Sequence, residues 1–305
     1  MIAVLSPGQG SQTPGMLVPW LGLPGAADRL ALWSQASGLD LTRLGTTATA
    51  EEITDTAVTQ PLVVAAALLA FEEIERTHGL PENMVVAGHS VGELAAAAVA
   101  GVISADDAVA LAAIRGAEMA KACALAPTGM SAVLGGDEDA VLERLTELGL
   151  EAANRNAAGQ IVAAGLLTDL AELAANPPEK ARIRPLPVAG AFHTRFMAPA
   201  QDAVVAAAAS ITPSDPTRRL LSNLDGREVT SGADALAKLA GQVTRPVRWD
   251  LCTATLRAAE VASIVELPPA GTLVGIAKRE MRGTPTVALK TPEDVSGLTA
   301  PVSVG

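Results

Sequence analysis

The stretch VVAGHSVGELAAAAVAGV, residues 85–102, decides the fold because it contains the pattern Gly-X-Ser-X-Gly at residues 88–92. An apolar run, 84–87, precedes the pattern, and an alanine-rich helical run follows it. A serine between such a strand and such a helix is typical of a nucleophile elbow, in which the glycines allow a sharp turn and close packing. The alternative is an ordinary strand-to-helix turn capped by Ser90. The pattern indicates an α/β fold with Ser90 as a candidate nucleophile.

The sequence on both sides of this stretch continues the alternation of strands and helices. Residues 2–6 favour a buried strand that ends at a Pro-Gly turn, and residues 59–79 and 104–125 favour helices. After residue 193 the chain returns to helix, and strands are expected within 218–226, 262–267 and 286–289. This alternation predicts a mostly parallel sheet covered by helices on both faces.

A different pattern occupies the middle of the chain. Residues 129–189 read strand, helix, strand, strand, helix, strand, with a turn at Ala157-Ala158-Gly159 between the two central strands. This order is the ferredoxin-like arrangement. We therefore expect a small ferredoxin-like domain, residues 127–189, inserted into a large α/β domain formed by residues 1–126 and 190–305.

Composition and charge exclude several classes of protein. The chain has 305 residues and is 49% hydrophobic and 18% charged, which fits a globular protein with a large core. Its net charge of −11 argues against nucleic acid binding, which needs a basic surface. The N-terminus lacks the basic region of a signal peptide, and the uncharged stretch 57–71 is shorter than a membrane span. We expect a cytoplasmic protein that does not enter a membrane.

No metal site is expected. Cys123 and Cys252 lie far apart in the sequence with no neighbouring cysteine or histidine, so both are interpreted as buried free thiols.

The glycine-rich loop at residues 8–12 fails the tests for nucleotide binding, because Thr13 stands at the third glycine position and no lysine follows Gly15. Such a loop can instead offer a backbone N–H to an oxyanion.

A serine nucleophile needs a base, and the chain has three histidines. His89 is adjacent to Ser90, so its side chain should point away from the serine. His78 precedes Gly79 at a helix end, which is an ordinary place for a histidine. His193 follows a strand and is therefore the candidate base. No acidic residue before His193 stands out as a third member, so a dyad and a triad both remain open.

The chain resembles the malonyl-CoA:acyl carrier protein transacylases, which are related to the acyltransferase domains of polyketide synthases. The shared motifs, in chain order, are PGQGSQ at 7–12, GHSVGE at 88–93, RG at 115–116, ANRNAAGQIVAAG at 153–165, GAFH at 190–193 and QVTRPVRW at 242–249. The resemblance spans nearly the whole chain. It implies a large hydrolase-like α/β domain with a ferredoxin-like insertion.

The resemblance also implies roles for residues that carry the reaction. Ser90 matches the acylated nucleophile and His193 its base. Gln9 and Val91 match the positions whose backbone N–H groups form the oxyanion hole. Gln242 matches the residue whose backbone carbonyl orients the histidine in place of an acid, although alone it would be an unremarkable polar residue.

Four further residues match the acyl pocket of the family. Arg115 matches the arginine that holds the malonyl carboxylate, and a guanidinium suits a carboxylate because both are planar forks. Without the family match, a solvated arginine on an amphipathic helix would be the better interpretation. Phe192 matches a position where phenylalanine accompanies selection of malonyl donors. The alternative interpretation is that its ring only packs in the core. Asn154 and Asn156 match residues that support the pocket, and their alternative is an ordinary turn.

These matches predict a transferase with a ping-pong mechanism, in fatty acid or polyketide synthesis. Its substrate is malonyl-CoA and its partner an acyl carrier protein; no cofactor, metal or nucleic acid is expected, and the chain should be a monomer. A serine esterase or thioesterase is the first rival, and a non-catalytic docking subunit the second. One stretch departs from the family: LPPAGTL at 267–273 has Pro268 and Ala270 where glycines are common, and no catalytic residue is expected there.

The carrier protein is expected to be acidic, so its docking on a chain with a net charge of −11 requires a local basic group. Lys180, Arg182, Arg184 and Arg195 cluster in the sequence and form the expected surface. The alternative is a solvated strand edge.

Overall fold

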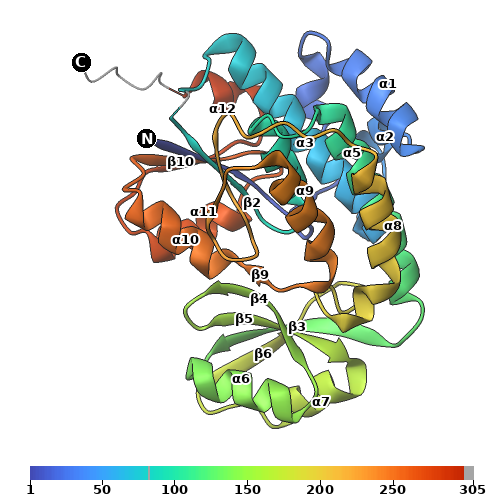
Figure 1. The fold of residues 1–305 in the computed structure, drawn as a ribbon, viewed down its shortest axis with the longest axis vertical. Helices are drawn as coiled ribbons and strands as arrows, with labels where there is room; N and C mark the ends of the chain where they lie inside the picture. Colours follow the sequence, from blue (N-terminus) through green and yellow to red (C-terminus); the bar gives the residue numbers. More distant parts are fainter. Residues whose placement is uncertain (82, 299–305) are drawn as a thin grey trace.

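The computed structural model describes residues 1–81 and 83–298. Its larger sheet has six strands in the order β11-β10-β1-β2-β7-β8 (Figure 1). All neighbouring strands pair in parallel except β7 and β8, so the predicted mostly parallel sheet is confirmed. The strands are β1 Ile2–Ser6, β2 Val85–Gly88, β7 Arg219–Leu221, β8 Glu228–Val229, β10 Ser263–Glu266 and β11 Thr286–Ala288.

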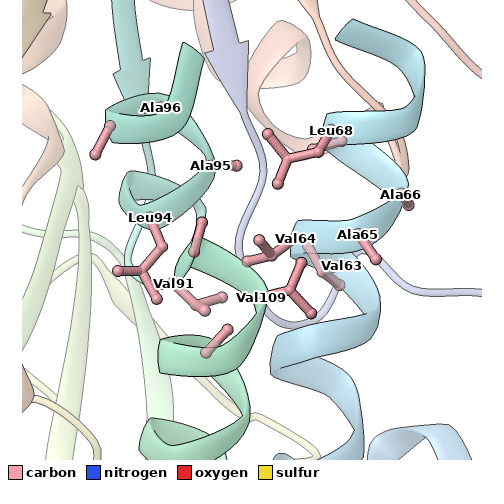
Figure 2. Close-up of a cluster of buried hydrophobic side chains, with 14 of the residues drawn as sticks. Val63, Val64, Ala65, Ala66, Leu68, Val91, Leu94, Ala95, Ala96 and Val109 are labelled. Carbon is pink, nitrogen blue, oxygen red and sulfur yellow. The ribbon is translucent and has the colours of Figure 1, made fainter. Parts of the chain in front are cut away.

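Helices cover both faces of this sheet. Successive residues of a strand point to opposite faces, so apolar residues of one strand contribute to two separate cores. Val4 belongs to a core shared with one group of helices: α1 Ala26–Ser37, α2 Leu41–Thr46, α3 Thr56–Thr77, α4 Gly92–Val99, α5 Ala105–Cys123, α8 Ala198–Ala209, α9 Gly232–Gly241 and α12 Pro292–Ser296. Leu5 belongs to the opposite core, shared with α10 Trp249–Ala258 and α11 Thr272–Glu280. Figure 2 shows the small side chains that pack in the first core, among them Val64 and Ala95.

Helix α3, with 22 residues, is the longest helix of this core. The helix begins after Asp55, whose side chain accepts the N–H of Ala57, and it continues to Thr77, beyond the uncharged stretch 57–71. Within the described residues it is the one helix long and apolar enough to cross a membrane. However, 72% of its apolar window is buried inside the fold, where it packs against α4 and α5. Packing in the core accounts for its composition.

A second sheet lies below the first in Figure 1, with strand order β6-β3-β5-β4-β9. Its elements are β3 Thr128–Gly135, α6 Glu138–Glu147, β4 Glu151–Ala157, β5 Gln160–Leu166, α7 Leu167–Ala175, β6 Ala181–Pro185 and β9 Val247–Arg248. Helices α6 and α7 share a separate core with one face of the sheet. Strands β3, β5, β4 and β6 pair antiparallel.

Strand β9 was not predicted. It comes from the C-terminal part of the chain and pairs in parallel with Asn154 and Arg155 of β4. Only two residues form it, so no periodicity marks it in the sequence. The short helices η1 Val18–Gly22, η2 Glu52–Thr54, η3 Arg195–Met197 and η4 Gln242–Thr244 complete the described elements.

Candidate active site

The turn between β2 and α4 places Ser90 in a left-handed backbone conformation, with φ of 54°. Its flanking glycines are required by close approach: a Cβ on Gly88 would lie 2.1 Å from the backbone of Gly92, and one on Gly92 would lie 2.3 Å from the carbonyl oxygen of Ser6. The N–H of Ser90 donates to Oδ1 of Asn223 at 2.8 Å. No side chain caps α4, so the alternative interpretation of Ser90 as a helix cap is wrong.

The side chain of Ser90 faces a cavity of about 240 Å³ between the two sheets. Its wall includes eight of the nine residues singled out from the sequence: Gln9, Ser90, Val91, Arg115, Asn154, Asn156, Phe192 and His193. Gln242, the ninth, lies behind the wall and contacts two of its members. Residues far apart along the chain therefore meet at one site.

His193 bonds to Ser90 through Nε2, which lies 2.7 Å from the serine Oγ. Its Nδ1 lies 2.9 Å from the backbone carbonyl of Gln242. A carbonyl oxygen only accepts, so Nδ1 carries the proton and Nε2 is free to take the proton of the serine. Within the described residues no carboxylate forms a hydrogen bond with His193.

The environment of His193 keeps the imidazole neutral. Burial, and then the positive charge of Arg115, lower the pKa of His193 to about 3. A histidine in an unfolded chain has a pKa of about 6.5. Between these two values the folded state binds fewer protons than the unfolded state, so the contribution of His193 to stability is complete above the unfolded pKa and declines as the pH falls toward about 3.

We expect the Cε1 proton resonance of His193 not to titrate between about pH 8 and pH 5 in an NMR titration. The His193→Ala variant identifies the resonance, and the chain unfolded in urea provides the reference near pH 6.5. A folded-state His193 resonance with a midpoint at the unfolded value would contradict the neutral, buried imidazole.

Arg115 is 2% exposed on helix α5, so the interpretation as a solvated arginine is wrong. One terminal nitrogen donates to Oε1 of Gln60 at 2.6 Å. The other donates to Oε1 of Gln242 at 2.9 Å and lies 3.4 Å from the Oγ of Ser90. Burial lowers the pKa of Arg115 to about 10, and the charge of Glu93 opposes this, so the guanidinium stays charged at neutral pH. A cation therefore lies beside the serine oxygen.

Two backbone N–H groups are placed to receive an anion. Val91 immediately precedes the N-terminus of α4, where the helix dipole favours negative charge. Gln9 lies in the loop after β1, and its side chain donates to Oγ1 of Thr56 at 3.2 Å. In the described parts of the chain, neither the Gln9 nor the Val91 N–H donates a hydrogen bond. The Ser90 N–H is occupied by Asn223 and is not available.

The remaining predicted residues form other parts of the wall. Phe192 is 6% exposed and immediately precedes His193. Asn154 and Asn156 lie on strand β4, so the alternative of ordinary turn residues is wrong. Oδ1 of Asn156 bonds to Nε2 of His89 at 2.9 Å, whereas Oδ1 of Asn154 is buried without a partner in the described structure.

The loop that departs from the family, 267–273, also contributes to the wall through Thr272 and Leu273. The buried carboxylate of Glu266 accepts the backbone N–H groups of Gly271, Leu273 and Val274 and so holds this loop.

The expected basic surface is divided between two places. Arg182 and Arg184 are exposed on strand β6, while Arg195 lies on η3 and pairs with Glu151. Lys180 pairs with its neighbour Glu179. The docking role of these residues stays a prediction.

Three residues of the site were not found from the sequence: Gln60, Glu93 and Asn223. Gln60 holds Arg115, and Asn223 holds the backbone of Ser90. Glu93 is 4% exposed, and burial raises its pKa to about 7. A carboxylate in an alanine-rich apolar helix was the available signal for Glu93, because buried charges require partners.

Known proteins resemble this chain over almost all of its length. The acyl transferase domain family matches residues 4–296. The malonyl CoA-acyl carrier protein transacylase of Mycobacterium tuberculosis (strain ATCC 25618 / H37Rv) is 68% identical over 299 residues, 98% of this chain and 99% of that protein. The transacylase of the same name from Escherichia coli (strain K12) is 33% identical over 297 residues, 95% of this chain and 96% of that protein.

Solved structures show the same likeness. The crystal structure of MCAT from Mycobacterium tuberculosis matches with a TM-score of 0.94 at 67% identity, covering 97% of this chain and 98% of that one. The complex PlMCAT:AntF (holo), a type II PKS acyl-carrier protein with its malonyl-transacylase, matches with a TM-score of 0.89 at 28% identity, covering 97% of each chain.

Proposed function

The chain belongs to the malonyl CoA-acyl carrier protein transacylases of the acyl transferase family, and on this basis we propose that Ser90 carries the malonyl group from malonyl-CoA to the carrier protein. The chain is an acyltransferase. The observation that carries the residue-level proposal is the bonded pair of Ser90 and His193 beside the guanidinium of Arg115.

In the first half-reaction, Ser90 Oγ attacks the thioester carbonyl of malonyl-CoA while Nε2 of His193 takes its proton. The N–H groups of Gln9 and Val91 stabilise the oxyanion that forms. The carbon–sulfur bond then breaks, and the leaving thiolate of CoA takes the proton from His193. The product is a malonyl ester on Ser90.

The second half-reaction reverses these roles. The phosphopantetheine thiol of the carrier protein gives its proton to His193 and attacks the ester carbonyl. The bond to Ser90 Oγ breaks, and the serine takes the proton back. The neutral imidazole suits both directions, because the same group must accept a proton and then return it.

Arg115 separates this proposal from its rivals. A serine esterase or thioesterase has no need of a buried cation 3.4 Å from its nucleophile, and it normally has an acid on its histidine. A docking subunit has no need of a bonded serine–histidine pair. The proposal assigns the malonyl carboxylate to Arg115 and further parts of the acyl pocket to Phe192, Asn154 and Asn156, and its support is that all four line the same cavity.

We also propose that residues 127–189 are a ferredoxin-like small domain within the large domain, 1–126 and 190–305. Its support is the strand order β6-β3-β5-β4 with both helices on one face. A monomeric enzyme in the cytoplasm, without a cofactor, remains part of the prediction.

The proposed function is tested by intact-mass spectrometry after brief exposure to malonyl-CoA. We expect a single malonyl adduct that persists without acceptor and disappears when holo carrier protein is added. Turnover of the adduct without acceptor would support the hydrolase, and absence of any adduct would support the docking subunit.

Replacing Arg115 with alanine should reduce malonyl transfer far more than acetyl transfer. The change removes the charge partner of a desolvated carboxylate, which costs about 2–5 kcal/mol, or roughly 30-fold to several thousand-fold in kcat/KM. Arg115→Lys should recover little, because an ammonium cannot form the planar fork. Rates with both donors decide the matter, and an equal loss for malonyl-CoA and acetyl-CoA would assign Arg115 a structural role.

Replacing Phe192 with serine should narrow the preference for malonyl over methylmalonyl donors. Its ring lines the cavity next to the fixed His193, and a branching methyl there would overpack the wall. Overpacking costs about 1–3 kcal/mol, roughly a ten- to hundredfold preference. The check is a competition between the two donors with a melting curve. An unchanged donor ratio, or a parallel loss of stability and both activities, would indicate core packing instead.

A further inference from the structure

Glu93, in the first turn of α4, is a buried carboxylate that the reaction does not use. One of its oxygens accepts the backbone N–H of Asn223 at 2.9 Å. The other accepts a hydrogen bond from Nε2 of Gln242. Within the described residues it forms no ion pair. A carboxylate held in this way is fixed by its hydrogen bonds, and it fixes its partners in return.

The bond to Gln242 determines which way its side-chain amide points. An ionised carboxylate only accepts, so Gln242 presents its NH₂ group to Glu93, and the same NH₂ group donates to Oδ1 of Asn223 at 3.3 Å. Its carbonyl oxygen, Oε1, then faces Arg115 and accepts from the guanidinium at 2.9 Å. The reverse orientation would set an NH₂ group against the NH₂ of Arg115. By holding the NH₂ group of Gln242, Glu93 thus keeps Oε1 of Gln242 directed at the guanidinium of Arg115.

The bond to Asn223 reaches the nucleophile. Asn223 accepts the N–H of Ser90 through Oδ1 at 2.8 Å and donates from Nδ2 to the carbonyl of Gly88 at 2.7 Å. Glu93 therefore connects to both the turn that presents the serine and the guanidinium beside it. These groups can meet because α4 contacts α9, the helix that ends just before Gln242.

We propose that Glu93 is a positioning residue of the malonyl site, which orients the guanidinium of Arg115 through the side-chain amide of Gln242. The inference rests on the proposed function and adds to it a structural origin for the expected preference for malonyl-CoA over acetyl-CoA. It assigns Glu93 no contact with substrate.

The variant Glu93→Gln separates this role from simple packing. The new side chain can accept the N–H of Asn223 through its carbonyl oxygen, but its NH₂ group then faces the NH₂ of Gln242. The conflict is moved to the N–H of Asn223 if the amide at position 93 turns, and it takes the acceptor away from Arg115 if Gln242 turns. We expect the ratio of kcat/KM for malonyl-CoA over acetyl-CoA to fall by about tenfold or more, since Arg115 loses a charge-assisted hydrogen bond.

The exchange variant E93Q/Q242E is the matched control. The amide now at position 93 donates to the carboxylate now at position 242, and that carboxylate accepts from Arg115. The donors of Arg115 and of position 93 again meet acceptors, and the number of carboxylates is unchanged. The one bond that is not restored is the donation from position 242 to Oδ1 of Asn223, which is 3.3 Å long in the wild type. The backbone carbonyl at position 242 remains available to His193. We expect the exchange to recover most of the lost donor preference, which a loss of packing alone would not do.

The experiment measures transfer from both donors, together with melting temperatures, for wild type, Glu93→Gln, Gln242→Glu and the exchange variant. A donor ratio within about twofold of wild type in Glu93→Gln, or an exchange variant no better than the single variants, would overturn the proposal. If Glu93→Gln does not fold, the exchange variant decides alone by retaining or losing the preference. Failure of the wild type to form the malonyl adduct would instead refute the proposed function.

Discussion

Replacing Ser90 with alanine is expected to abolish the malonyl adduct and transfer to the carrier protein. Loss of a serine nucleophile from a dyad or triad costs about a millionfold in kcat, because the covalent route disappears. No neighbouring group in the described cavity wall can replace the oxygen. Burial raises the pKa of the Cys123 thiol to about 11, and the Cys252 thiol is fully buried, so neither is a competent nucleophile at neutral pH.

Mass spectrometry of Ser90→Ala after exposure to malonyl-CoA, alongside a radioactive transfer assay, measures both losses. Ser90→Cys is the matched control, because it keeps a nucleophile of similar size at the elbow and should still form an adduct. A malonyl adduct on Ser90→Ala, or transfer within about a hundredfold of wild type, would show that another residue carries the acyl group.

Replacing His193 with alanine is expected to slow both half-reactions by about 10⁴-fold or more. The serine then has no base, and the leaving thiolate has no acid. The N–H groups of Gln9 and Val91 remain, and they should leave a residual rate above the uncatalysed reaction. That residual rate should rise with pH by roughly tenfold per unit, because hydroxide must now deprotonate the serine.

Single-turnover release of CoA and subsequent transfer to carrier protein measure the two half-reactions of His193→Ala separately. A melting curve tests whether the variant folds, since the change removes one of the two donors to the carbonyl of Gln242 and leaves only the N–H of Arg245. Near-normal rates in either half-reaction would show that His193 is not the base. A large loss in one half-reaction only would mean that a second group serves the other.

The local pattern of the sequence was sufficient for the elbow and for most strands. Glycines on either side of Ser90, an apolar run before them and alanines after them favour a strand, a sharp turn and a helix, and the structure has β2, the turn and α4 there. The order strand, helix, strand, strand, helix, strand in residues 129–189 likewise predicted four strands of the second sheet and the two helices packed on it. Such elements follow from nearest neighbours along the chain, so the sequence alone predicts them.

The roles of the site residues were predicted from motifs shared with the family and not from hydrophobic periodicity. Arg115 on its helix looks like an ordinary surface arginine, and Gln242 looks like an ordinary polar residue near a helix end. Only the family resemblance singled them out, and the buried guanidinium and the bond from His193 to the Gln242 carbonyl agree with it.

The sequence by itself determined most of the strands and helices, the position of the turn at Ser90, and His193 as the candidate base. Only the tertiary structure decided that Glu93 holds Gln242 and Asn223, that β9 joins β4, and that Arg115 is buried beside Ser90. The physical reason is the separation along the chain of the residues that determine each feature. Backbone conformation is set by residues within a few positions, whereas donors and acceptors that are distant along the chain find one another only when the sheets and helices pack and water is excluded.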